Sequence, residues 1–139
     1  MSKRDFFHIA VRKALEKDGW TIIADPLWID AGGINVAIDL AADRLIAADR
    51  NGEKIAVEVK SFLSGGSAVS EFHTALGQFL NYRVALRLDS PGRELYLAVP
   101  ESAYTTFFQL PIPKEQIEEF QVKLIVYEPI EEAVVLWKK

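Results

Sequence analysis

The chain contains no cysteine, and that absence alone excludes several kinds of site. Disulfide bridges, thiolate nucleophiles and cysteine-based zinc or iron–sulfur centres all require a thiol. Its two histidines, His8 and His73, lie on separate predicted helices without a second ligand one turn away. A zinc site is therefore not expected, and we interpret both histidines as ordinary helix residues.

Long apolar runs and an excess of basic charge are also missing. Asp5 follows Lys3 and Arg4, and no later stretch is apolar enough for a signal peptide or a membrane span. We therefore expect a cytoplasmic protein without membrane contact. The formal net charge of -4 does not supply the basic field that usually supports non-specific DNA binding. A nucleic-acid function would need a local basic patch or a basic partner.

The composition is that of a globular protein. Half of the residues are hydrophobic and 26% are charged, which is an ordinary balance for a folded chain. A length of 139 residues allows a well-buried core but is short for two domains. We therefore predict a single domain over 1–139 that folds unaided.

Hydrophobic periodicity and turn residues predict the order of helices and strands. We expect helices over 2–18, 70–88, 101–108 and 114–120, and strands over 20–24, 36–40, 44–48, 54–62, 94–99, 122–127 and 133–137. Residues 27–35 are predicted to be a loop, and Asp49–Gly52 a hairpin turn. A helix connects this hairpin to the next strand, so the class is α/β, with a mixed sheet flanked by helices.

The predicted hairpin carries three charged side chains, Asp43, Glu58 and Lys60. Strand side chains alternate between faces, so Glu58 and Lys60 share one face. A two-residue turn at 51–52 would set Asp43 opposite Lys60, and a turn at 50–51 would set it opposite Glu58. Either register gathers the three groups, whereas a three-residue turn would direct Asp43 to the other face.

Two carboxylates and a lysine in this arrangement suit phosphodiester hydrolysis. Asp43 and Glu58 would supply hard oxygen ligands for Mg²⁺ or Mn²⁺, while Lys60 orients or deprotonates a water or offsets developing charge. The alternative is a solvated strand face formed by Glu58 and Lys60. The strand lies between the hairpin and the crossover helix, where strands are central and a charged pair is costly unless it is used.

Other residues compete for roles in this site. Asp39 is a rival for the first carboxylate because it lies in an otherwise apolar segment, but we favour Asp43 for its spacing to the hairpin. Gln78 and Tyr82 lie one turn apart on the second long helix. Gln78 could hold a water or a catalytic side chain, or both residues could pack against the sheet.

Two further groups of residues concern partners. Arg83, Arg87 and Arg93 could contact phosphate, or stabilise the end of the second helix through its dipole alone. The aromatic residues toward the C-terminus could form an interface or pack on the sheet: Tyr104, Phe107, Phe108 and Phe120. Because the chain is acidic and its basic residues are scattered, we expect it to act in a complex.

The order of these motifs resembles the PD-(D/E)xK nuclease superfamily. Asp43 is followed by fourteen residues and then by Glu58-Val59-Lys60, after one helix and before another, although Ala42 stands where proline is usual. Gln78 and Tyr82 are similar to the Gln-x-x-x-Tyr element of RecB-like members. The resemblance implies a restriction-endonuclease-like fold with Asp43, Glu58, Lys60 and Gln78 as catalytic residues.

Four longer segments resemble the XisH family, cyanobacterial factors that control excision of the fdxN DNA element: KDGWTI, RLIAADRNGEKIAVEVKSF, ALGQFLNYR and RELYLAVPE. This resemblance implies a role in programmed DNA rearrangement, usually with a small companion protein of the XisI family. Two functions stay open, a metal-dependent endonuclease and a catalytically inactive accessory that binds the companion or a recombinase. Whether DNA contact is direct, and whether the chain forms a homo-oligomer, also stays open.

Overall fold

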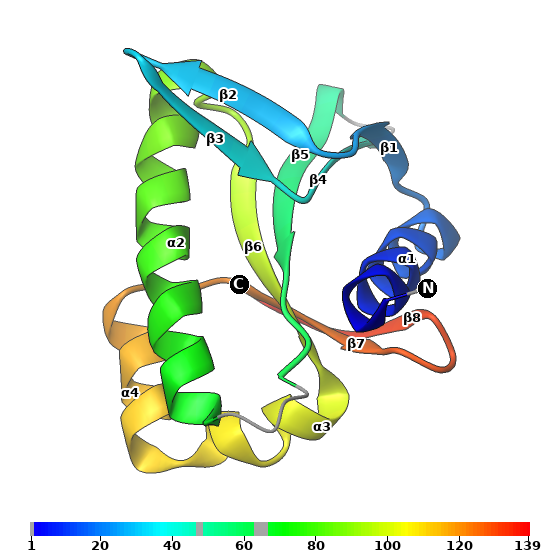
Figure 1. The fold of residues 1–139 in the computed structure, drawn as a ribbon. Helices are drawn as coiled ribbons and strands as arrows, with labels where there is room; N and C mark the ends of the chain where they lie inside the picture. Colours follow the sequence, from blue (N-terminus) through cyan, green and yellow to red (C-terminus); the bar gives the residue numbers. More distant parts are fainter. Residues whose placement is uncertain (1, 47–48, 63–66) are drawn as a thin grey trace.

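The computed structural model describes residues 2–46, 49–62 and 67–139, and combines helices with β-strands (Figure 1). The first half contains α1 (Lys3–Lys17), β1 (Thr21–Ala24), β2 (Leu27–Ala31), β3 (Ile34–Ile38), β4 (Leu40–Ile46) and β5 (Asp49–Val59). The second half contains α2 (Ala68–Asp89), β6 (Glu94–Pro100), α3 (Glu101–Tyr104), the 3-10 helix η1 (Phe107–Gln109), α4 (Pro111–Glu119), β7 (Leu124–Glu128) and β8 (Ala133–Lys138). The helices predicted over 2–18, 70–88 and 114–120 are confirmed, whereas the one predicted over 101–108 is divided into α3 and η1.

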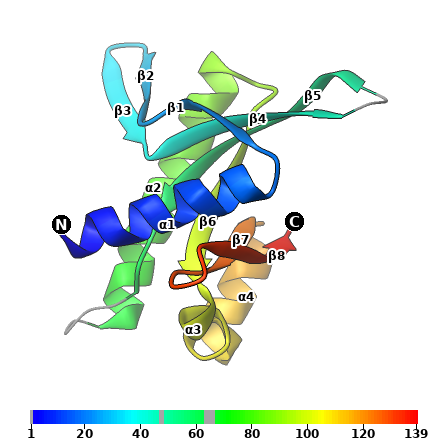
Figure 2. The ribbon, with the colours of Figure 1, turned by 90° about the vertical axis from the view of Figure 1, so that its right-hand side faces the viewer.

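Six of the strands form one mixed sheet in the order β1-β4-β5-β6-β7-β8. The hairpin of β4 and β5 is antiparallel, β6 and β7 continue parallel to β5, and β8 closes the sheet antiparallel to β7. Helix α1 covers one face, while α2 and α4 cover the other (Figures 1 and 2). The predicted mixed sheet flanked by helices is therefore confirmed. Among the described residues, no helix has the length and apolar character needed to span a membrane.

Alternation along the central strands separates two hydrophobic cores. In β6, Leu95, Leu97 and Val99 belong to the core on the α2 side, whereas Tyr96 and Ala98 belong to the core on the α1 side. A strand that is buried on both faces has a nearly continuous apolar sequence. The central strands are consequently held from both sides, and the ends of these strands are the places where polar groups can be presented.

The aromatic residues considered for an interface pack inside the protein. The ring centroid of Phe108 lies 5.3 Å from that of Phe72 and 5.2 Å from that of Phe107. Phe108 is buried, and Tyr104, Phe107 and Phe120 pack, partly buried, against the same core. The segment containing α3, η1 and α4 connects β6 to β7 and lies back over the sheet, so its aromatic rings find apolar partners there.

The prediction of a loop over 27–35 is wrong, because these residues form most of the antiparallel hairpin of β2 and β3. Gly32 and Gly33 occupy its turn with φ of +63° and +88°, and positive φ at both turn residues matches the right-handed twist of the strands. Ile29 is buried while Trp28 is exposed. The exposed tryptophan hides the alternation by which a half-buried strand is recognised in sequence.

The predicted hairpin turn at Asp49–Gly52 is also wrong. Strand β4 ends at Ile46 and β5 already begins at Asp49, so the connection lies outside the described residues. Gly52 adopts φ of +64° within β5, and the register shifts just beyond the pair Arg44 and Glu53. The Asn-Gly dipeptide therefore belongs to an irregular stretch of the strand, as in a β-bulge, and not to the turn.

Replacement of Phe72 by alanine tests the contribution of the aromatic core. Phe72 is 1% exposed, so Phe72→Ala should lower the free energy of unfolding by about 3–5 kcal/mol through lost burial and an unfilled cavity. Leu88→Ala on the same helix is the control, because Leu88 is 73% exposed and its loss should cost less than about 0.5 kcal/mol. Urea unfolding measures both values, and equal losses would contradict this account of the core.

Candidate functional site

A cleft of about 440 Å³ opens where β5 ends. Five of its lining side chains carry chemistry that the sequence analysis considered: Asp39, Glu58, Lys60, Gln78 and Tyr82. Strand β4 begins at Leu40 opposite Val57, so the end of β5 extends beyond its antiparallel neighbour. On its other side β5 stays paired with β6 up to Val59. The cleft therefore lies at a gap in the sheet beside a strand that is firmly held.

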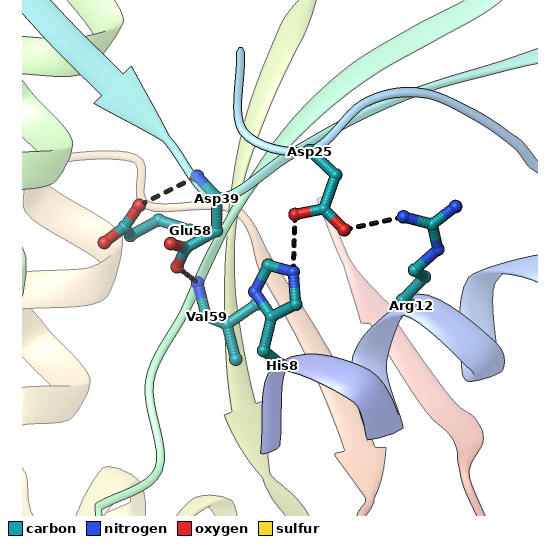
Figure 3. A network of polar contacts seen from close by, with 6 residues as sticks. All are labelled: His8, Arg12, Asp25, Asp39, Glu58 and Val59. Atoms are coloured by element: carbon teal, nitrogen blue, oxygen red, sulfur yellow. Dashed lines mark hydrogen bonds and ion pairs between the residues drawn. The ribbon is translucent and has the colours of Figure 1, made fainter. Parts of the chain in front are cut away.

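Asp39 lies at this gap and takes the place of a strand partner. The backbone N–H of Val59 donates to Asp39 Oδ2 at 2.8 Å, and the backbone N–H of Asp39 is 3.4 Å from Glu58 Oε1 (Figure 3). A buried backbone N–H requires an acceptor, and beyond the start of β4 the carboxylate supplies it. The same contacts hold the carboxylates of Asp39 and Glu58 beside each other.

Burial and charge act together on this pair of carboxylates. Glu58 is 6% exposed and Asp39 is 9% exposed. Burial, and after it the charge of Asp39, raise the pKa of Glu58 to about 7, whereas Lys60 opposes the increase. The Nζ atom of Lys60 lies 3.6 Å from Glu58 Oε2. The raised pKa shows that Lys60 does not fully offset the cost of a second negative charge at this position.

Tyr82 and Gln78 complete the α2 side of the cleft. Burial, followed by the charges of Glu58 and Asp39, raises the pKa of Tyr82, so its hydroxyl stays protonated at neutral pH. The Oε1 atom of Gln78 is buried and has no hydrogen-bond partner among the described residues. Buried acceptors are normally satisfied, so this oxygen is suited to receive a hydrogen bond from a water or a ligand in the cleft.

The structure does not bring Asp43 to this cleft. Asp43 pairs with Lys54 across the hairpin, and Arg93 Nη1 donates to Asp43 Oδ1 at 2.9 Å. Alternation places Asp43 on the same side of the sheet as Glu58, but four residues from Asp39 along the chain, roughly 13 Å away. The predicted register is wrong because the turn was placed at the Asn-Gly dipeptide. The rival residue, Asp39, is the carboxylate that lies beside Glu58.

The sequence analysis interpreted His8 as an ordinary helix residue, yet it also lines the cleft. Its Nε2 atom lies 2.7 Å from Asp25 Oδ1, and Arg12 Nη1 donates to Asp25 Oδ2 at 2.6 Å (Figure 3). His8 and Arg12 are one helical turn apart, which is the signal that they could share a partner. Asp25 follows β1 and lies far from His8 and Arg12 in the sequence, so only the fold identifies it as their shared partner.

The donor set suits a hard divalent cation with few protein ligands. Among the described residues, no group of three or more His, Cys, Asp and Glu side chains is arranged to hold a metal ion. Mg²⁺ is commonly held by one or two carboxylates, with water and substrate phosphate as its other ligands. The adjacent oxygens of Asp39 and Glu58, together with the unpartnered Gln78 oxygen nearby, fit such an ion and its water.

The pKa of Glu58 predicts how stability depends on pH. Because folding raises this pKa from 4.5 to about 7, the folded protein retains a proton that the unfolded chain has lost between these values. The stabilisation is full below about pH 4.5 and is lost as the pH rises through 7. Glu58→Gln has no ionisable group at this position. Over this pH interval the free energy of unfolding of the wild type should therefore fall by about 2–3 kcal/mol relative to that of the variant.

Urea unfolding of both proteins at pH 5 and pH 8, in metal-free buffer with a chelator, measures this difference. The free energy of unfolding of the variant, relative to that of the wild type, should be greater at pH 8 than at pH 5. If the difference in free energy of unfolding between the two proteins is the same at both pH values, Glu58 does not have a raised pKa.

Comparison with known proteins identifies the family of the chain. A sequence model described as XisH protein matches residues 1–135, whereas a search of curated proteins finds no match. The crystal structure of an XisH family protein from Nostoc punctiforme is 57% identical, covering 97% of this chain and 100% of that chain, with a TM-score of 0.89. A crystal structure described as an fdxN element excision controlling factor protein, from Anabaena variabilis, is also 57% identical, covering 98% and 100% of the two chains with a TM-score of 0.89. The chain therefore belongs to the XisH family.

Proposed function

We propose that this chain acts in the excision of a DNA element and that its cleft hydrolyses phosphodiester bonds with Mg²⁺ or Mn²⁺. The excision role rests on family membership and on the relative from Anabaena variabilis, which is described as an fdxN element excision controlling factor. The observation that supports catalysis is the convergence of Asp39, Glu58 and Lys60 on one open cleft. The raised pKa of Glu58 is what a cation in that cleft would reverse.

The order of elements supports a restriction-endonuclease-like fold. Helix α1 precedes the hairpin of β4 and β5, and α2 then crosses to the parallel strand β6, as the resemblance to the PD-(D/E)xK superfamily implies. The proposal replaces Asp43 by Asp39 as the first carboxylate of the motif. Glu58-Val59-Lys60 keeps its place at the end of β5, and Ile38 then stands at the position usually held by proline.

Each residue of the cleft has a role in this proposal. Asp39 and Glu58 would hold the cation, which on binding polarises the phosphate and lowers the pKa of water. Lys60 orients the attacking water or offsets charge that develops on the phosphate. Gln78 accepts a hydrogen bond from that water, and the protonated hydroxyl of Tyr82 is available to donate one to the substrate.

Paired substitutions in one segment separate Asp39 from Asp43. Asp39→Asn removes the charge but keeps an oxygen that can accept from Val59, so the fold should persist. We expect this variant to bind Mn²⁺ at least about tenfold more weakly in the presence of DNA and to lose cleavage, because one of two charged ligands is gone. Asp43→Asn, the matched control, should retain both properties.

Calorimetric titration with Mn²⁺ and cleavage assays on varied DNA measure these effects, with circular dichroism as the check on folding. Loss of cleavage in Asp43→Asn but not in Asp39→Asn would show that Asp43 is the first carboxylate of the motif. Cleavage at the wild-type rate by both variants and by Glu58→Ala would end the catalytic proposal.

A second function, that of an inactive accessory, is favoured by the surface of the β2–β3 hairpin. Trp28 is 70% exposed there, on the face of the hairpin opposite to the buried Ile29, and the hairpin projects from the sheet (Figure 2). Exposed aromatic residues of this kind are enriched at protein interfaces. The net charge of -4 also favours a partner that supplies contact with DNA. The proposed partner is a small companion of the XisI type or a recombinase.

Replacement of Trp28 by alanine tests this surface. Light scattering of the chain mixed with a small protein of the XisI type should show a complex, and Trp28→Ala should weaken it about tenfold, since exposed tryptophans often dominate interfaces. Leu110→Ala is the control, because Leu110 is 53% exposed but lies in the segment between η1 and α4. Equal affinity of Trp28→Ala and wild type would exclude this surface.

A further inference from the structure

A second cavity, of about 300 Å³, lies on the α2 side of the sheet at the start of β6. Glu94, which lines it, is level with Ile55 in the parallel pair, whereas Glu58 of the cleft is level with Leu97. The two hollows therefore lie toward opposite ends of the central strands. Four cationic side chains line the second one: Arg83, Arg87, Arg93 and Lys123.

Arg93 is held in place by one end of its guanidinium group. Its Nη1 atom donates to the carbonyl oxygens of Ala42 at 3.3 Å and Ile55 at 3.0 Å, and to Asp43 at 2.9 Å. The side chain is 9% exposed. A guanidinium has five N–H donors, and the contacts within the described residues all use Nη1. Arg93 also lines the cavity, and its Nε and Nη2 donors form no hydrogen bond with the described residues.

Arg83 is fixed in a similar way from the other wall. Its Nη1 atom donates to the carbonyl oxygens of Phe120 at 2.8 Å and Gln121 at 3.3 Å, and the guanidinium lies over the ring of Phe79, 5.5 Å from its centroid. Arg87, one turn further along α2, is exposed and forms no hydrogen bond or ion pair with the described residues. The cavity is thus lined by the fixed guanidinium groups of Arg83 and Arg93 and by the adjustable one of Arg87.

Negative charge in the cavity is smaller than positive charge. Glu94 is the carboxylate that lines it, and it pairs with Lys123 at 2.8 Å, while Asp43 approaches Arg93 from the sheet. Attraction to the dipole of α2 would explain why Arg87 lies near the C-terminal end of that helix. It would not explain why Arg83 and Arg93 are fixed by carbonyls of other segments and have donors left over.

We propose that this cavity binds a phosphate group. Guanidinium groups offer pairs of N–H donors whose spacing matches phosphate oxygens, and groups already held in position lose little conformational entropy on binding. The volume also accommodates part of the molecule that carries the phosphate, either a free nucleotide or the backbone of a nucleic-acid strand. The site does not depend on chemistry at Asp39 and Glu58.

Titration of the isolated chain with inorganic phosphate tests the site, with chloride at equal ionic strength as the reference. The arginine Nε–H signals in NMR spectra should shift saturably with phosphate only. Arg87→Gln should weaken phosphate binding about tenfold through loss of a charged donor. Lys114→Gln removes the same charge from an exposed position on α4, outside the cavity, and should change the affinity less than twofold. Glu94→Gln should strengthen binding because it frees Lys123.

A short single-stranded DNA and a nucleoside monophosphate, each added to the phosphate-bound protein, identify the source of the group. Displacement of phosphate by the DNA at lower concentration than by the nucleotide assigns a backbone phosphate, and the reverse order assigns a free nucleotide. Equal shifts with phosphate and chloride, or equal losses of affinity in Arg87→Gln and Lys114→Gln, would overturn the proposal. Urea unfolding of Arg87→Gln measures separately how much Arg87 stabilises the C-terminal end of α2.

Discussion

The hydrogen bond from the backbone N–H of Val59 to the carboxylate of Asp39 is the contact on which the cleft depends. Strand β4 begins one residue after Asp39, so β5 would otherwise end with an unpaired, part-buried donor. The carboxylate satisfies that donor and is thereby placed beside Glu58. One interaction at the edge of a strand pair thus completes the sheet and forms the candidate site.

The two hydrophobic cores make this arrangement rigid. Ala56 faces the core on the α2 side, while Ile55 and Val57 face the core on the α1 side, so the residues preceding Glu58 cannot easily move. The Glu58 carboxylate is held at the end of such a strand, where burial first and the charge of Asp39 second raise its pKa. Rigid support of this kind is also what holds a catalytic group in a reactive position.

Charge is distributed unevenly over the α2 side of the sheet. The cleft at the end of β5 is acidic, whereas the cavity at the start of β6 is lined by Arg83, Arg87, Arg93 and Lys123. A divalent cation would offset the negative charges of the Asp39 and Glu58 carboxylates in the cleft. An acidic protein can therefore present positive charge locally, even though its net charge is -4.

The sequence by itself determined the features that depend on local pattern. The spacing of apolar residues predicts helices α1 and α2 and strands β6 and β7, and the structure has them. Strand alternation also predicts that Glu58 and Lys60 lie together, and their charged groups are 3.6 Å apart. Alternation also placed Asp43 on the correct side of the sheet. The positions of Gln78 and Tyr82 beside the cleft follow from their spacing on one helix face.

Only the tertiary structure decided which carboxylate accompanies Glu58. Gly52 lies in β5 with a positive φ, which can serve a turn or an irregular strand equally well. The choice is made by how β4 packs between β1 and β5, with Arg93 bonded to Ala42 and Ile55. Those contacts join segments far apart in the chain, and no local pattern contains them, so Asp39 lies in the cleft and Asp43 does not.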